Sequence, residues 1–172
     1  MAPMSDEGRR IRSYLQAQAA KLSPSEIIAK VRAAMDELRT ALFAIASARF
    51  AERPAPDEWS ANEVMAHVVG AGAHFGDRIT GALAGVSPGA DRVQREVLTL
   101  SAIEWWDRLV QDRTALFDRV EHADPDAHLD RVIEHGMFGA LNWREALLFL
   151  RLHDLDHVGQ LRKIAEALAP AP

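Results

Sequence analysis

The chain has 172 residues, which is enough for one domain with a substantial core. It carries 20 Lys and Arg residues against 25 Asp and Glu residues. The resulting charge of −5 argues against a general nucleic-acid-binding protein, because phosphate contacts require clustered basic side chains. There is no cysteine, so disulfides, thiolate metal sites and cysteine nucleophiles are excluded, and any transition metal must have nitrogen and oxygen ligands.

Two further features bear on where the protein acts. No stretch approaches the ~18 consecutive apolar residues of a membrane-spanning helix. The first ten residues, MAPMSDEGRR, are polar and contain no apolar signal-peptide core. Together with the lack of cysteine, these features predict a cytoplasmic protein that has neither a membrane nor nucleic acid as a partner.

The elements expected in the first part of the chain are helices. Alanine occurs 30 times, runs of β-branched residues are missing, and no proline interrupts a helical pattern. Ser23, followed by Pro24 and Glu26, forms a capping box that predicts a long helix over about residues 24–50. A shorter amphipathic helix is expected before it, with an apolar side formed by Ile11, Leu15 and Leu22.

A proline-containing loop at residues 52–58 leads to the next predicted helix. Ser60 and Glu63 form a second capping box, and the helix they begin is expected to end near Leu83. The apolar residues of this helix that recur at helical spacing are Val64, Val68, Ala71, Phe75 and Ile79.

After a turn region at residues 85–91, a further helix is predicted over about residues 92–121. Ser101 and Glu104 offer a third capping box inside this segment. The helix can therefore begin late or break near Thr99.

A long connection over about residues 121–141 precedes the last helix. Connections of this length without regular structure are uncommon and often act as lids or binding loops. Asn142 is expected to cap the last helix, with Glu145 at the third position, and the helix continues to about Leu168. It is apolar on all sides over residues 146–150, so we expect it to be central.

Four long helices and one short helix predict an all-α fold, a four-helix bundle with an extra N-terminal helix. We expect a single domain over residues 1–172, with its core over residues 24–168. No internal repeat is present.

The placement of histidines carries the functional signal. His153 and His157 lie one helical turn apart, so their rings can converge on one metal ion, although the spacing alone equally fits two partly exposed polar residues. They share their helix face with apolar residues, and burying two imidazoles without partners is costly. His67 lies on an apolar stripe of another helix, where one inward histidine more often makes a core hydrogen bond. Three inward histidines with open coordination positions would form a known catalytic arrangement.

The other four histidines are expected to stand outside the ligand set. His74 lies two turns beyond His67, where it packs, is solvated or supports a ligand. His122 and His128 lie in polar sequence and are expected to be exposed. His135 reaches a site only if the long connection folds over it.

Two segments that carry the three histidines resemble the DinB-like superfamily, the DinB/YfiT-type metal-dependent proteins. They are WSANEVMAH at residues 59–67 and FGALNWREALLFLRLHDLDHVGQLRKI at residues 138–164. Members typically show a tryptophan and a cap before a helix with one histidine, and a later helix with His-x-x-x-His, often followed by Gln. The resemblance covers about residues 24–168.

The resemblance implies an antiparallel four-helix bundle, often a homodimer, with a divalent metal held by three histidines. Carried over residue by residue, the ligands would be His67, His153 and His157, and zinc or nickel would be the metal. Some relatives transfer a low-molecular-weight thiol such as mycothiol or bacillithiol, and others are described as metal-dependent hydrolases. The family name DinB does not imply that its members bind DNA.

Residues near the expected ligands have predicted roles of their own. Gln160, one turn beyond His157, is expected to contact a ligand or the substrate, and Asp156 to orient a histidine or act as a base, although it also fits a solvated helix position. Asp154 is expected to be structural. The segment Glu134–Leu141 is expected to cover the open coordination positions, with Met137 and Phe138 as an apolar wall.

Three functions remain open at this point. The first is a metal-dependent transferase that uses a low-molecular-weight thiol on a small electrophilic substrate; 17 Arg against 3 Lys suggests a GC-rich genome and favours mycothiol. The second is a metal-dependent hydrolase with hydroxide in place of the thiolate, for which Asp156 and Glu63 are the available bases, Glu63 being already engaged in a cap. The third is a non-enzymatic helical binding or stress module.

Overall fold

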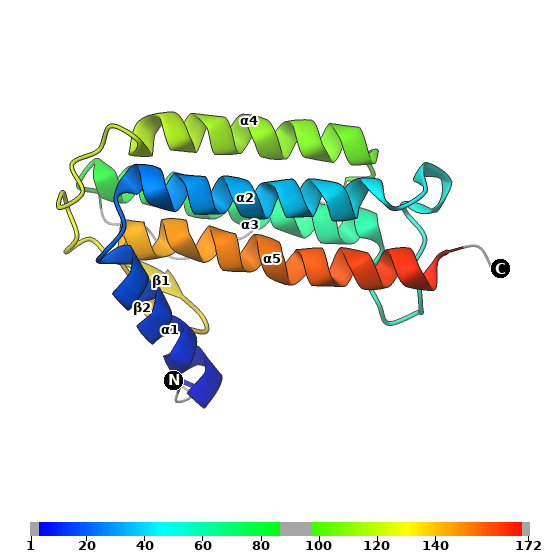
Figure 1. The fold of residues 1–172 in the computed structure, drawn as a ribbon, viewed down its shortest axis with the longest axis horizontal. Helices are drawn as coiled ribbons and strands as arrows, with labels where there is room; N and C mark the ends of the chain where they lie inside the picture. Colours follow the sequence, from blue (N-terminus) through cyan, green and yellow to red (C-terminus); the bar gives the residue numbers. More distant parts are fainter. Residues whose placement is uncertain (1–3, 87–97, 170–172) are drawn as a thin grey trace.

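A computed structural model describes residues 4–86 and 98–169 and shows a bundle of four long helices with a short helix at its side (Figure 1). The helices and strands are α1 (Asp6–Ala19), α2 (Pro24–Phe43), a 3₁₀-helix η1 (Ser47–Arg49), α3 (Ala61–Leu83), α4 (Ala102–Val120), β1 (Ile133–His135), β2 (Gly139–Leu141) and α5 (Trp143–Ala167). The predicted all-α four-helix bundle with an extra N-terminal helix is confirmed.

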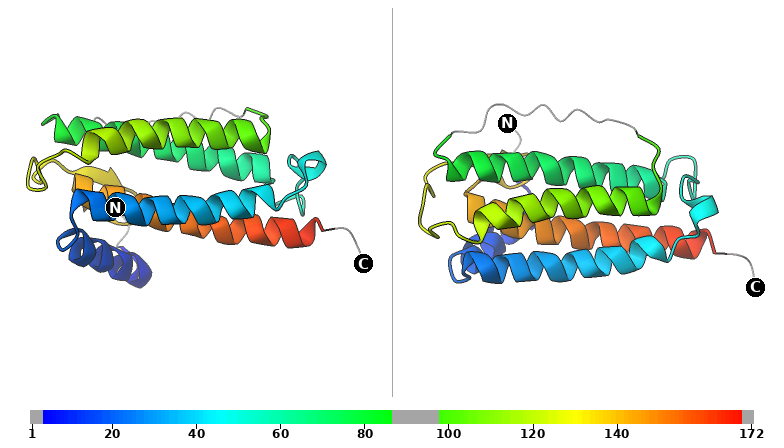
Figure 2. Two further views of the ribbon diagram at one scale, coloured as in Figure 1. Left: turned by 45° about the horizontal axis from the view of Figure 1, so that its top comes forward. Right: turned by 90° about the horizontal axis from the view of Figure 1, so that it is seen from above.

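The four long helices run two in each direction. In Figures 1 and 2, α2 and α5 run one way, and α3 and α4 run the opposite way. Helix α5 packs against α1, α2 and α3. Its residues 146–150 are all buried, which confirms that this helix is central.

Each bundle helix begins at a capping box that the sequence predicts. Ser23, Ser60 and Ser101 accept a hydrogen bond from the backbone N–H of a glutamate three residues later, whose carboxylate accepts one in return. Asn142 does the same at the start of α5. Because a cap of this kind satisfies backbone donors that a helix leaves free, it fixes where the helix begins.

Helix α2 is shorter than predicted. It ends at Phe43 instead of near residue 50, and η1 follows. The break turns Ile45 and Phe50 into the core, where they are 6% and 4% exposed. The Phe50 carbonyl then accepts a hydrogen bond from the backbone N–H of Asn62 at 3.1 Å, which joins this segment to the start of α3.

Helix α4 begins late, at Ala102, as its capping box allows. The buried Asn62 side chain explains why the preceding residues are not helical. Its Nδ2 donates to the Leu98 carbonyl and its Oδ1 accepts from the Leu100 N–H, both at 3.0 Å, so this backbone is bonded to α3. The part of the predicted helix at residues 92–97, like most of the expected turn at residues 85–91, lies outside the described residues.

The connection before α5 is more ordered than predicted. Strands β1 and β2 form an antiparallel hairpin in which Ile133 pairs with Leu141, and both side chains are fully buried. The indole of Trp143 donates to the Ala127 carbonyl at 2.8 Å, which holds the earlier part of the connection against α5. In the described parts of the chain, no helix combines the length and apolar character needed to cross a bilayer.

Candidate metal centre

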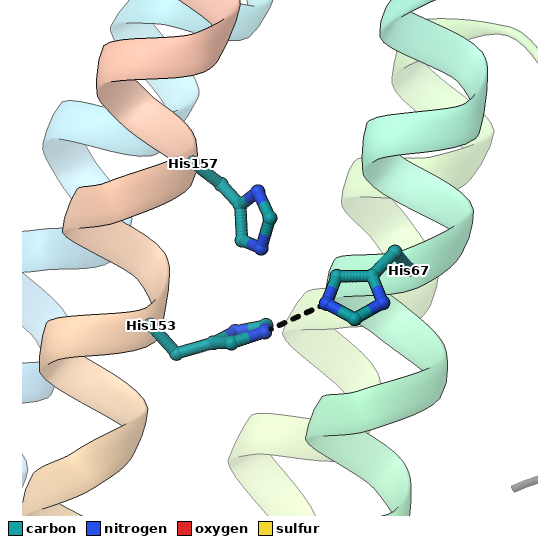
Figure 3. Close-up of side chains that lie close together, drawn as sticks. All are labelled: His67, His153 and His157. Carbon is teal, nitrogen blue, oxygen red and sulfur yellow. Dashed lines mark hydrogen bonds between the residues drawn. The ribbon is translucent and has the colours of Figure 1, made fainter. Parts of the chain in front are cut away.

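Three histidines meet between α3 and α5 (Figure 3). His67 comes from α3, and His153 and His157 come from successive turns of α5. One ligand nitrogen from each ring can be chosen so that all lie within 4.8 Å of one another, and the Nε2 atoms of His67 and His153 are 3.1 Å apart. Among the described residues, these histidines are the group of three or more His, Cys, Asp or Glu side chains that lie close enough together to hold one metal ion.

The surroundings of His157 favour its neutral form. Burial is the main cause that lowers the pKa of its imidazole, and the neighbouring His153 lowers it further. Its Nδ1 lies 2.9 Å from Oε1 of Gln160, an atom that can only accept, so Nδ1 carries the proton. The lone pair of Nε2 is then free, which is the state that binds a metal.

The three polar residues of α5 that were expected near the ligands lie in three different environments. Gln160 contacts His157, as described above. Asp156 is exposed on α5, and its negative charge acts against burial by favouring a higher pKa of the His157 imidazole. Asp154 is fully buried and forms an ion pair with Arg113 of α4 at 3.0 Å.

Sequence reasoning missed Arg113 as a neighbour of the site. A signal was available, because Arg113 occupies a position in the apolar stripe of α4. The residues of this stripe that are buried with it are Leu109, Leu116, Phe117 and Val120. A charged residue at such a position needs a buried partner, and Asp154 supplies it.

One side of the cluster is covered by aromatic rings. The Phe149 ring lies 5.7 Å from the His153 ring and packs on Phe75, Phe138 and the stacked His135. The hairpin therefore contributes Phe138, which is 3% exposed, to the apolar wall. The expectation for Met137 is wrong: its side chain is 58% exposed, whereas a residue of the apolar wall would be buried as Phe138 is.

The remaining histidines stay outside the ligand group. His135 stacks on Phe138 with ring centroids 4.4 Å apart, and its Nδ1 accepts from the Met137 N–H at 3.1 Å. His74 meets the ring of Phe75 edge-on. The two histidines of the polar connection, His122 and His128, are exposed.

A cavity of about 480 Å³ lies on another side of the cluster. It is lined by His157, Gln160 and Ile164 of α5 and by three exposed charged residues, Asp57, Glu58 and Lys163. The Trp59 side chain also lines it, and the indole lies 5.4 Å from the His67 ring. The cavity is within the size range of small-molecule sites, which extends over about 300–1,000 Å³.

This donor set fits a divalent transition metal. Three imidazoles from two helices are typical of sites that hold zinc, nickel or similar ions and leave positions open for a water or substrate. The lowered pKa of His157 supports the fit, because a protonated ring cannot bind. The hydrogen bond that Gln160 accepts from His157 supports it as well, because it fixes which nitrogen of His157 is free.

Comparisons with known proteins bear on the fold and the family of the chain. A crystal structure described as "TT2238, a four-helix bundle protein" matches with a TM-score of 0.63 and 20% identity, over 82% of this chain and 99% of that chain, which shows the fold alone. None of the curated proteins matches the chain. The profile of the DinB superfamily matches residues 30–161, more than half of the chain, and this segment includes all three histidines. The chain therefore belongs to the DinB superfamily.

Proposed function

We propose that the protein is a metal-dependent transferase that joins a low-molecular-weight thiol to a small electrophilic substrate. The observation that carries the proposal is the cluster of His67, His153 and His157 beside the cavity. These three residues would hold zinc or nickel. When bound, such an ion supplies a positive charge that lowers the pKa of a thiol or water bound to it.

The carboxylates near the cluster favour a thiol over water as the nucleophile. Asp154 is paired with Arg113, and Asp156 is exposed. Glu63 is held by Arg53 and by its cap, and these hydrogen bonds lower its pKa, the Arg53 bond most. A carboxylate with a lowered pKa is a weak base. A thiol needs less help than water to lose its proton, because its pKa of about 8.5 is far lower than that of water.

The reaction we propose is a substitution at carbon. The thiol loses its proton to solvent, its sulfur forms a bond to the electrophilic carbon, and the bond from that carbon to the leaving group breaks. The leaving group departs with the electron pair. Gln160 lines the cavity beside His157 and is placed to contact either reactant, and Trp59 offers a flat apolar wall.

A chromogenic electrophile tests this proposal. Protein loaded with zinc or nickel is mixed with 1-chloro-2,4-dinitrobenzene and one thiol. Three separate reactions contain mycothiol, bacillithiol or cysteine as that thiol. We expect thioether formation and chloride release above the rate of chelator-treated protein, and loss of this excess rate in His67→Ala. The absence of any excess rate with all three thiols would contradict the proposal.

Two other outcomes identify the alternative functions. Cleavage of ester or amide substrates without any thiol would identify a metal-dependent hydrolase. A protein in which the three histidines can be replaced by alanine without loss of metal content, folding or assembly would be a non-enzymatic module. The first result is read from the unaltered protein and the second from the triple alanine variant.

The cellular setting and assembly belong to the same proposal. Low-molecular-weight thiols are kept reduced in the cytoplasm, where we propose that the protein acts. We also propose a homodimer, formed through an exposed apolar patch on α2 and α4 that we define as Phe43, Ile103, Trp106 and Val110. Arg39 lies 6.0 Å from the rings of both Phe43 and Trp106 and so joins the two helices at this patch. Phe43 and Ile103 are 45% and 53% exposed, and a partner subunit would cover them.

A further inference from the structure

A buried ion pair lies beside the histidine cluster, and the proposed reaction does not use it. Nη2 of Arg113 donates to both carboxylate oxygens of Asp154, at 3.0 and 3.3 Å. The side chains are 2% and 0% exposed. The pair joins α4 to α5 next to His153, which precedes Asp154 in the chain.

Stability alone explains this pair poorly. Nε and Nη1 of Arg113 are buried and have no hydrogen-bond partner in the described structure. Buried pairs with unsatisfied donors often stabilise a fold no more than apolar residues of similar size would. The guanidinium also needs space beside α3, where a Cβ atom on Gly72 would lie 3.4 Å from Nη2.

The carboxylate of Asp154 also faces His153. Oδ1 lies 3.9 Å from Nδ1 of His153, and this nitrogen is buried with no hydrogen-bond partner in the described structure. A lone pair on Nδ1 would be repelled by the carboxylate, whereas an N–H there is attracted to it. The carboxylate thus favours the form of His153 that carries its proton on Nδ1. In that form the lone pair is on Nε2, which points to His67 and the centre of the cluster.

We propose that Asp154 is a positioning residue that fixes the tautomer and ring orientation of His153 for metal binding, and that Arg113 holds the Asp154 carboxylate in place. The inference rests on the metal site of the proposed function. Carboxylates that accept from the outer nitrogen of a ligating histidine play this part in many metal sites. Here the carboxylate belongs to the residue next to the ligand, acts through its charge at 3.9 Å and not through a hydrogen bond, and is held by α4.

Two variants separate positioning from structural support. Asp154→Asn keeps the shape and an acceptor oxygen but removes the charge that attracts the N–H of His153. The double variant Arg113→Met with Asp154→Leu removes both buried charges together, so no unpaired charge remains in the core. Asp118→Asn, an exposed acid of α4, controls for the loss of one negative charge.

Zinc affinity is measured by competition with a chromophoric chelator, after circular dichroism has shown that each variant is folded. We expect Asp154→Asn and the double variant to bind zinc about 10–100-fold more weakly than the unaltered protein, the usual cost of losing such a carboxylate. Asp118→Asn should bind as the unaltered protein does.

Nitrogen NMR of the metal-free protein, at a pH where His153 is neutral, gives a readout that a purely structural role would not change. We expect the proton of His153 on Nδ1 in the unaltered protein, and a mixture of tautomers in the double variant. A folded double variant that keeps both the zinc affinity and the Nδ1 proton would overturn the inference. Failure of the unaltered protein to bind zinc or nickel would instead count against the proposed function itself.

Discussion

The Nε2 atoms of His67 and His153 lie 3.1 Å apart, although 86 residues separate the two histidines in the chain. The packing of α3 against α5 creates this contact, because each histidine lies on the face that its helix turns toward the other (Figure 3). The packing of the two helices thus brings the ligand nitrogens together. Binding sites of this kind lose less entropy when a ligand binds than sites that must first be assembled.

Removing His67 should abolish metal binding. The substitution His67→Ala leaves two ligands on one helix and breaks the link between α3 and α5, so the metal content should fall from about one equivalent per chain to a small fraction of it. Elemental analysis of protein purified without a histidine tag measures this. His74→Ala, on the same helix but outside the cluster, is the control and should keep its metal. Equal metal content in both variants would exclude His67 as a ligand.

Metal should also stabilise the bundle. An ion that binds the folded chain and not the unfolded chain raises the free energy of unfolding by about 2.7 kcal/mol when its concentration is 100 times the dissociation constant. We therefore expect the melting temperature to rise with added zinc or nickel and to fall with a chelator. Calcium, which prefers oxygen ligands, serves as the control ion. A melting temperature that zinc and nickel leave unchanged would argue against the site.

Acid should weaken the fold through the capping box of α3. Arg53 first, and the cap at Ser60 next, hold the pKa of Glu63 below its ordinary value. The folded state thus binds a proton less readily than the unfolded state. The stability from this carboxylate is therefore complete above the unfolded pKa of about 4.3 and is lost as the pH falls through the lower folded value.

The variant Glu63→Gln tests this dependence. At pH 7 it should be less stable by about 1 kcal/mol or less, because Gln can still accept at the cap but loses the charge that pairs with Arg53, and the difference should shrink as the pH falls below about 4. Urea unfolding at a series of pH values measures it. Glu166→Gln, an exposed glutamate of α5, controls for the lost charge. A difference that is constant across the whole pH range would show that Glu63 acts by packing.

A charge in the apolar patch should separate a dimer into monomers. Ile103→Asp places a carboxylate at a side chain that is 53% exposed in the single chain, so the monomer should tolerate it while a packed interface should not. The mass measured by light scattering should fall from twice the 19.0 kDa of one chain to 19.0 kDa. Val132→Asp, at another exposed apolar side chain, should keep the larger mass. A monomeric unaltered protein would exclude the proposed homodimer.

The features that could be predicted from the sequence depend on short-range order. The capping boxes at Ser23, Ser60, Ser101 and Asn142 each involve four consecutive residues, and the structure confirms all four. The pairing of His153 with His157 follows from one helical turn. For His67, the apolar stripe on its helix indicates the direction in which the side chain points.

Other features depend on contacts between distant segments and could not be predicted. Helix α2 ends early because Phe50 turns inward to contact the start of α3. The hairpin next to α5 depends on pairing between strands too short to give a periodic signal. The contact between Arg113 and Asp154 spans 41 residues, and only the packing of α4 in the bundle brings the two together.

The rings of Phe149 and Phe138 cover one side of the histidines, whereas the cavity reaches them from the side of Gln160 and Trp59. Two reactants that enter through this cavity must pass the same residues, so the one that lies deeper has to enter first and leave last. Steady-state kinetics would then show a compulsory order of addition. A product that stays in the cavity would occupy the same entrance and so compete with the reactant that enters first.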